Sequence, residues 1–250
     1  MMNELELLVD LNLQQDRQGP GGTKETLQAL ELLNVDTNQN IRIADIGCGS
    51  GAQTIDLAQN TKAHITAVDI FPQFLDKLKI KAENLNLSDR ITTLCASMDD
   101  MPFEKESLDV IWSEGAIYIM GFEKGIQYWS NFLKKDGYIA ISELSWTTHK
   151  RPVELEKFWK EAYPEIDTIS NKVKVLEGSG YSPVGFFTLP AYCWLDNYYQ
   201  PLQKEMAAFL GRHPNNKLAE QVVNENRDEI ELYQKYKEYY SYGFYIARKI

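Results

Sequence analysis

A glycine-rich turn between a short apolar strand and a helix constrains the fold of this chain more than any other feature. The turn reads Asp45-Ile46-Gly47-Cys48-Gly49-Ser50-Gly51-Ala52 and fits both a GxGxG and a GxGxxA pattern. An apolar run at 41–46 precedes it, and a helical pattern at 53–59 follows it. Because glycines allow a tight turn and a close approach of the backbone to a ligand, this context predicts a ligand-binding turn at the start of a βαβ unit.

Strands and helices alternate along most of the chain. Such alternation, with connections of this length, indicates right-handed crossovers and a mainly parallel sheet. The helices expected after the turn helix are residues 72–85, 122–135, 152–162 and 168–177. The strands expected from their apolar runs are residues 41–46, 63–68, 90–96, 108–112, 138–142, 184–189 and 242–247.

The length of 250 residues fits one α/β domain with additions, so residues 1–250 are expected to form a single domain. Residues 1–34 carry two loose helical patterns around a glycine and proline cluster and are expected to form an N-terminal helical cover. Residues 190–241 are too many for a plain connection and are expected to form a helical insertion between the last two strands.

Charge and composition exclude several classes of function. The formal net charge of −10, without any block of lysines and arginines, argues against nucleic acid as a partner. The start of the chain does not resemble a secretory signal, and no long apolar run predicts a membrane span. Cys48, Cys95 and Cys193 lie far apart without metal-ligand spacing, which indicates reduced thiols, no metal site and a cytoplasmic location. A homodimer remains open.

An acidic residue at the end of the next strand points to the ligand class. Asp69 follows the turn by about twenty residues, a spacing at which a carboxylate accepts both ribose hydroxyls, so an adenosine-containing cofactor is expected. NAD would place a diphosphate over the turn, beside the unfavourable charge of Asp45, whereas S-adenosylmethionine (SAM) offers an ammonium and a sulfonium. Asp45 is equally open to interpretation as a loop-stabilising carboxylate.

With these motifs in order, the sequence resembles the class I SAM-dependent methyltransferases, in particular their ubiquinone/menaquinone-biosynthesis-like, small-molecule branch. The resemblance implies a Rossmann-like, seven-stranded, mostly parallel α/β sheet of order 3-2-1-4-5-7-6, with the last strand antiparallel, helices on both faces and helical lid segments. The segments that carry it are ADIGCGSGAQT (44–54), AVDIF (67–71), ASMDDMPFEKESLDVIWSEGAIY (96–118) and LKKDGYIAISE (133–143).

The resemblance also implies a set of residues that bind SAM. The glycines of the turn would line its methionine part, and a carboxylate just past the fourth strand would contact its ammonium. A second group would hold the nucleoside, with a serine at the position where the family usually has an acidic residue that binds adenine. The residues so implied are Gly47, Gly49, Gly51, Asp69, Ile70, Ser97 or its neighbour Asp99, Met98 and Glu114.

Few catalytic side chains are obligatory for methyl transfer, because the reactive group belongs to the cofactor. A base is useful for a hydroxyl or a protonated amine, and Tyr118, Glu143 and His149 are the candidates near the expected mouth. Each is also explained by packing or by exposure in a loop. Arg17, in a segment at 17–22 that could form a lid, is a candidate partner for the methionine carboxylate or a plain surface arginine.

An aromatic run at Tyr192, Trp194, Tyr198 and Tyr199 could wall a substrate pocket or hold a cationic amine, but core packing explains it as well. Three functions follow from the sequence. The leading hypothesis is a SAM-dependent methyltransferase acting on an O, N or C atom of a small molecule. The alternatives are an NAD(P)-dependent oxidoreductase and a protein that binds SAM without catalysis.

Overall fold

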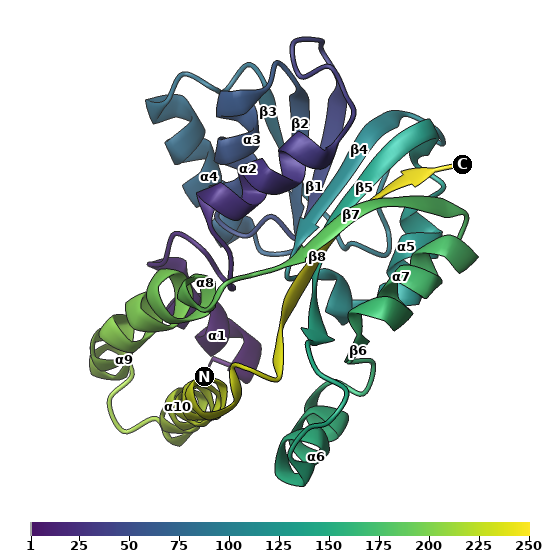
Figure 1. Ribbon diagram of the computed structural model, residues 1–250. Helices are drawn as coiled ribbons and strands as arrows, with labels where there is room; N and C mark the ends of the chain where they lie inside the picture. Colours follow the sequence, from purple (N-terminus) through teal and green to yellow (C-terminus); the bar gives the residue numbers. More distant parts are fainter. Residues whose placement is uncertain (1) are drawn as a thin grey trace.

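The computed structural model describes residues 2–250, and residue 1, the first of the expected N-terminal cover, lies outside them. One twisted sheet runs through the molecule in the order β3-β2-β1-β4-β5-β8-β7, and helices cover both of its faces (Figure 1). The Rossmann-like α/β architecture, the strand order and the antiparallel strand at position 240–249 are therefore confirmed. The sheet has one strand more than expected, the two-residue β6 at Asp167–Thr168 beside β5.

The parallel half of the sheet contains the apolar runs of the first part of the chain. Its strands are β1 (Arg42–Ile46), β2 (His64–Asp69), β3 (Ile91–Cys95) and β4 (Leu108–Glu114). Nearly all residues of β1 and β4 are buried, as expected for strands covered on both faces. The neighbours β1 and β4 run parallel in register, with Asp45 opposite Trp112.

Helices pack on both faces of this sheet and give two apolar cores. One core contains side chains of α2 (Thr23–Leu32), α3 (Ala52–Asn60) and α4 (Pro72–Asn84). The other contains side chains of α5 (Phe122–Trp129) and α7 (Ile169–Gly178). Pro72 begins α4, where its missing N–H costs no hydrogen bond.

The expected helix at 122–135 is wrong at its C-terminal end. Helix α5 ends at Trp129, and β5 already begins at Leu133 and continues to Trp146. Leu133 pairs with Leu108 of β4 across a register shift, and Asp136 takes a left-handed φ of 64° in the irregular segment. The far end of β5 is longer than expected because Leu144 to Trp146 pair with Tyr240 to Tyr242 of β8.

The end of the chain completes the sheet. Strand β7 (Tyr181–Thr188) lies at the edge and pairs antiparallel with β8 (Tyr240–Lys249), which in turn pairs antiparallel with β5. The segment between β7 and β8 folds into α8 (Ala191–Trp194), the π-helical turn η2 (Leu195–Tyr199), α9 (Gln200–Arg212) and α10 (Lys217–Tyr236).

These late helices join the first helix of the chain in one lobe. Helix α1 (Glu4–Leu13) contacts α9 and α10, and Figure 1 shows this lobe at one end of the sheet. Helix α6 (Val153–Ala162) follows β5 and lies beyond the same end. Segments from both ends of the chain therefore meet where the strands β1 and β4 end.

Candidate cofactor and acceptor site

The site forms at the carboxyl ends of β1 and β4, where the direction of the chain across the sheet reverses. Ligands in open α/β sheets bind at such a switch point. The glycine turn follows β1, and Glu114 and Gly115 end β4 and begin the next loop. These two segments form opposite walls of one crevice.

The glycine turn presents bare backbone to the crevice. Gly47 and Gly49 adopt left-handed φ angles of 71° and 53°, which residues with a side chain rarely adopt. The N–H groups of Gly47 and Cys48 donate to the carbonyl of Val68, at 2.8 and 3.0 Å, and so attach the turn to β2. The turn is therefore held in its shape by the neighbouring strand.

Asp69 joins the turn to the end of β2. Its Oδ2 accepts a hydrogen bond of 2.9 Å from the N–H of Gly49, and its Oδ1 accepts one of 2.9 Å from the N–H of Phe71. Desolvation raises the pKa of this carboxyl group, although the backbone donors oppose that shift. Each oxygen retains a further lone pair for a ribose hydroxyl.

Asp45 lies beneath the crevice and does not line it. Its side chain is completely buried and accepts hydrogen bonds from Thr54 Oγ1 at 2.5 Å and from Gln53 Nε2 at 3.3 Å. Burial raises the pKa of Asp45 to about 7. Gln53 does line the crevice and also donates to the carbonyl of Cys48 at 3.3 Å. Asp45 therefore holds the start of α3 and acts on the crevice through Gln53.

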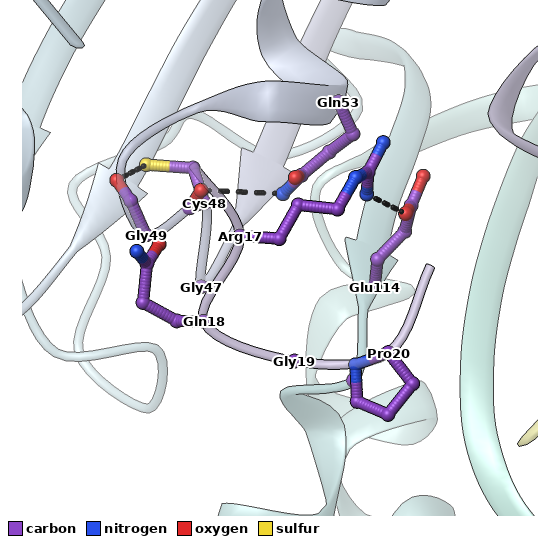
Figure 2. Close-up of a pocket in the computed structure, with 10 residues that line it drawn as sticks. Arg17, Gln18, Gly19, Pro20, Gly47, Cys48, Gly49, Gln53 and Glu114 are labelled. Carbon is purple, nitrogen blue, oxygen red and sulfur yellow. Dashed lines mark hydrogen bonds and ion pairs between the residues drawn. The ribbon is translucent and has the colours of Figure 1, made fainter. Parts of the chain in front are cut away.

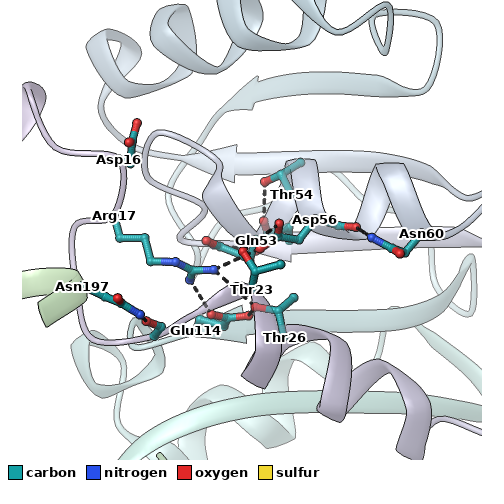
Figure 3. A network of polar contacts seen from close by, with 12 residues as sticks. Asp16, Arg17, Thr23, Thr26, Gln53, Thr54, Asp56, Asn60, Glu114 and Asn197 are labelled. Atoms are coloured by element: carbon teal, nitrogen blue, oxygen red, sulfur yellow. Dashed lines mark hydrogen bonds and ion pairs between the residues drawn. The ribbon is translucent and has the colours of Figure 1, made fainter. Parts of the chain in front are cut away.

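Arg17 lies at the centre of a polar network that fastens the N-terminal segment to β4 (Figure 3). Its guanidinium donates to Glu114 at 2.9 Å and to Asp56 of α3 at 3.1 Å. Thr26 of α2 also donates to Glu114, at 2.7 Å, as does the indole N–H of Trp112, at 3.0 Å. The carboxylate of Glu114 is thus fully engaged by three donors.

Residues 17–20 cover the glycine turn. Figure 2 shows Gln18 against Gly49 and Arg17 directed to Glu114 across the crevice. The Gln18 Oε1 accepts from the N–H of Ser50 at 2.7 Å, and a Cβ built on Gly49 would lie 2.3 Å from that same oxygen. Because this segment occupies its mouth, the crevice measures about 70 Å³, well below the ~300–1,000 Å³ of pockets for larger ligands.

The residues present fit SAM. A bare glycine backbone, the free lone pairs of Asp69 and the acidic surroundings made by Asp45 and Glu114 suit a nucleoside that carries positive groups. A diphosphate would meet the negative charge of Glu114 on the crevice wall, which repels it. Residues 17–20 must move aside to admit a ligand of this size.

The other residues predicted to bind the nucleoside surround the same end of β2 and β3. Ile70 is 56 % exposed, and Ser97 is half-buried and donates to Asp99 at 2.5 Å. The Met98 side chain approaches Gly47, since its Cε would lie 3.7 Å from a Cβ there. Gly51 instead faces Leu78 of α4, whose Cδ1 would lie only 2.3 Å from a Cβ at this position, so Gly51 serves helix packing.

A second cavity of about 220 Å³ adjoins the crevice and shares Gln18, Gly19, Pro20 and Gly115 with it. The cavity is walled by six aromatic rings, which come from four segments of the chain. Glu229 of α10 is the one residue with a charged side chain among the described residues that line it. The aromatic residues are Tyr118, Trp159, Tyr163, Trp194, Tyr198 and Tyr242.

The three candidate catalytic residues lie in different places. Tyr118 lines the aromatic cavity. Glu143 is buried behind it, hydrogen-bonded to the hydroxyl of Tyr163 and 3.5 Å from Lys172 Nζ, and burial raises the pKa of Glu143 to about 7. His149 is exposed in the loop after β5 and lines neither the crevice nor the aromatic cavity. Only Tyr118 is therefore in position to touch an acceptor.

Of the predicted aromatic run, Trp194 and Tyr198 line the cavity and Tyr192 and Tyr199 do not, and sequence reasoning missed several other residues of the wall. Trp159, Tyr163 and Glu229 lie in or beside helices whose local pattern indicates only amphipathic packing. Gly115 was detectable, because it follows the predicted Glu114 directly. A Cβ on Gly115 would lie 2.8 Å from the ring of Tyr242, so this glycine lets the ring close against the backbone.

Across residues 2–250, no group of three or more His, Cys, Asp or Glu side chains is placed to hold a metal ion. None of the helices in the same residues combines the length and the apolarity needed to cross a membrane.

Comparison with known proteins finds a methyltransferase domain in the chain. Residues 43–137 match the family described as "Methyltransferase domain". An uncharacterized protein of Haemophilus influenzae is 25% identical over 184 residues, which are 64% of this chain and 72% of that protein. Ubiquinone/menaquinone biosynthesis C-methyltransferase UbiE of Citrifermentans bemidjiense is 29% identical over 114 residues, 44% of this chain and 48% of that protein. Most of the curated relatives match over less than two thirds of their own length.

The fold is shared over nearly the whole chain. A SAM-dependent methyltransferase of Geobacter sulfurreducens, crystallised with S-adenosyl-L-homocysteine, has a TM-score of 0.85 at 20% identity and covers 98% of both chains. The matched domain, the glycine turn and the sheet order agree with one another. Together they show that the chain contains a methyltransferase domain and has the fold of the SAM-dependent methyltransferases to which it is similar.

Proposed function

We propose that this protein transfers the methyl group of SAM to an O, N or C atom of a small molecule held in the aromatic cavity. The observation that carries the proposal is the direct junction of the two cavities, which share Gly115 and residues 18–20. A cavity of about 220 Å³ has room for a small molecule. The acidic surface of the chain also disfavours nucleic acid.

Each wall of the crevice has a task in this proposal. Asp69 accepts the ribose hydroxyls, and the bare backbone at Gly47 and Gly49 takes the methionine part. Ile70, Met98 and the Ser97–Asp99 pair surround the adenine. Arg17 pairs with the methionine carboxylate, and the backbone carbonyl of Glu114 accepts from the ammonium, since the Glu114 side chain is already engaged.

When bound, SAM supplies an electrophilic methyl carbon on a sulfonium, and its displacement needs an acceptor aligned with the carbon–sulfur bond. The protein contributes orientation and the exclusion of water. The aromatic rings around the cavity fix the acceptor and keep water away from it. Among the four tyrosines on the cavity wall, Tyr118 is the predicted catalytic candidate, and its hydroxyl would relay an acceptor proton.

Kinship with the ubiquinone/menaquinone-biosynthesis branch is part of the proposal. It is supported by the 29% identity to UbiE over 114 residues. The residues of α6, α8 and α10 that wall the cavity lie outside the matched methyltransferase domain at 43–137. The kinship therefore concerns the cofactor half of the protein, and the acceptor is set by the other half.

Calorimetric titration tests cofactor binding, with NADH as the competing ligand. We expect saturable binding of SAM and of S-adenosylhomocysteine but none of NADH. Asp69→Asn should weaken SAM binding by at least about tenfold, equivalent to ~1.4 kcal/mol, because the amide donates where a ribose hydroxyl needs an acceptor. Asp76→Asn, on the exposed face of α4, is the matched control. Binding of NADH without SAM would instead support the oxidoreductase alternative.

Turnover is tested separately, because a protein that only binds SAM would give the same titration. SAM labelled in its methyl group is incubated with panels of small amines, phenols and carbon acids, and the labelled product is identified. Label on one acceptor class assigns the transferred atom. Tight SAM binding with no label transferred to any panel would favour the non-catalytic alternative.

A further inference from the structure

The aromatic cavity is lined by six aromatic side chains and has a single acidic group. The rings of Trp194 and Tyr242 lie with centroids 4.8 Å apart, and those of Tyr118 and Tyr163 with centroids 6.0 Å apart. These four residues come from α8, β8, η1 (Ile117–Ile119) and the turn after α6. Aromatic side chains around a cavity attract a cation to their ring faces, since each face carries the negative part of the ring quadrupole.

Glu229 gives the cavity its charge. Its Oε1 accepts a hydrogen bond of 2.8 Å from the hydroxyl of Tyr199, and desolvation raises its pKa. Within residues 2–250, no lysine, arginine or histidine forms an ion pair with Glu229. A half-buried carboxylate without a cation is costly, and a cationic ligand would supply the missing partner.

Two cations beside the two cavities, Lys172 and Arg17, already have carboxylate partners. Lys172 is buried, lies 3.5 Å from Glu143 and donates to the carbonyl of Glu165 at 2.9 Å. Arg17 is paired with Glu114 and with a second carboxylate in the N-terminal network. The cavity is therefore aromatic and acidic. An anionic acceptor would be repelled by Glu229, and a neutral acceptor would not supply Glu229 with a cationic partner.

We propose that the methyl acceptor is a small aliphatic amine, held by the aromatic rings and by Glu229 in the cavity beside the glycine turn. This inference rests on the proposed function and narrows it from O, N or C acceptors to nitrogen. The volume of about 220 Å³ limits the amine to a small molecule. A neighbouring groove that includes Tyr118, Tyr198 and Glu229 gives it a route from the surface.

The reaction balances with the groups at hand. An amine that arrives as an ammonium ion first gives its proton to the Glu229 carboxylate. The lone pair of the nitrogen then forms the bond to the methyl carbon, while the electron pair of the carbon–sulfur bond remains on sulfur. The products are a methylated ammonium and a neutral thioether, so the positive charge passes from the crevice to the cage of rings.

Ligand binding without turnover tests the inference. Tetramethylammonium chloride and tert-butyl alcohol, similar in size and different in charge, are titrated into the protein at constant ionic strength, with and without saturating S-adenosylhomocysteine. Trp159 and Trp194 line the cavity, so tryptophan fluorescence reports occupancy. We expect saturable binding of tetramethylammonium at least tenfold tighter than that of the alcohol. Equal binding of the two, or no binding of the cation, would overturn the inference.

Two variants separate the parts of the site. Glu229→Gln keeps the shape and should weaken tetramethylammonium binding at least tenfold, whereas Glu231→Gln, exposed on the same helix, should change it less than twofold. Tyr118→Leu removes a ring that is 47 % exposed. It should weaken the binding of tetramethylammonium severalfold more than the binding of tert-butyl alcohol. Unchanged cation binding in both Glu229→Gln and Tyr118→Leu would refute the cage.

Titration with S-adenosylhomocysteine distinguishes a failure of the amine inference from a failure of the proposed function. A wild-type protein that binds S-adenosylhomocysteine but not tetramethylammonium overturns only the amine inference. A wild-type protein that fails to bind S-adenosylhomocysteine overturns the proposed function beneath it. The same titration shows whether Glu229→Gln and Tyr118→Leu retain an intact crevice.

Discussion

Replacing Gly49 by alanine separates the strain of a left-handed residue from the loss of ligand contact. Its φ of 53° costs a residue with a side chain ~1–2 kcal/mol, partly offset by ~0.4–1 kcal/mol from the less flexible unfolded chain. The net loss of about 1 kcal/mol should lower Tm by ~2–4 °C in a protein of this size. The new methyl group would point into the crevice, 2.3 Å from the resting position of Gln18 Oε1.

Gly180→Ala is the matched control. Gly180 has a φ of 83° in the turn before β7, and a Cβ there would meet nothing within 4 Å. Both variants should lose similar stability in thermal or urea denaturation. Only Gly49→Ala should weaken SAM binding in calorimetry, by at least about tenfold or ~1.4 kcal/mol. Equal SAM affinity in the two variants would refute the assignment of the cofactor to this turn.

Two further predictions concern stability. Asp45 has a pKa raised from 3.8 to about 7, so the folded state binds its proton more tightly and wild-type stability should fall as pH rises from about 4 to about 7, by at most about 4 kcal/mol. Glu143, whose pKa is also raised to about 7, adds a slope of the same sign, so Asp45→Asn should show a shallower fall than the wild type in urea titrations across that range. Parallel profiles would contradict the burial argument. Arg17→Gln leaves Glu114 and Asp56 without their cation and should cost about 2–4 kcal/mol. Lys81→Gln breaks a surface pair with the exposed Asp16 and should cost less than about 1 kcal/mol, so similar losses would show that the Arg17 network adds nothing.

The sheet could be predicted from the sequence because its strands are buried on both faces. Mainly apolar runs such as Ile43 to Ile46 and Leu108 to Trp112 are typical of buried strands. The glycine turn shows which of these strands begins the βαβ unit. The boundary between α5 and β5 was not predictable in this way. Lys134 to Asp136 are polar and suit a helix end or an exposed strand start, and pairing with β4 decides between them.

The cofactor side of the site could be anticipated, but the acceptor side only at Tyr118, Trp194 and Tyr198. Asp69 and Glu114 follow strands directly, so the topology alone brings them to one end of the sheet. Tyr163 and Glu229 reach the cavity because α6 and α10 pack beyond that end. Such packing depends on contacts between distant segments, which no local periodicity records.

Asp45 shows how a correct motif can carry a different role. Its position two residues before Gly47 predicts either contact with a cationic ligand or a role in stabilising the loop. In the structure the side chain lies under the turn and accepts hydrogen bonds from Gln53 and Thr54. Gly51 is similar, since it permits close packing of Leu78. Both residues shape the crevice from behind its wall.

A crystal structure of the complex with S-adenosylhomocysteine tests the central claim most directly. We predict the nucleoside in the crevice, with its ribose hydroxyls on Asp69, its amino acid part along Gly47 and Gly49, and residues 17–20 displaced from their present cover. Density for the ligand elsewhere, with Gln18 still bonded to the N–H of Ser50, would contradict the account.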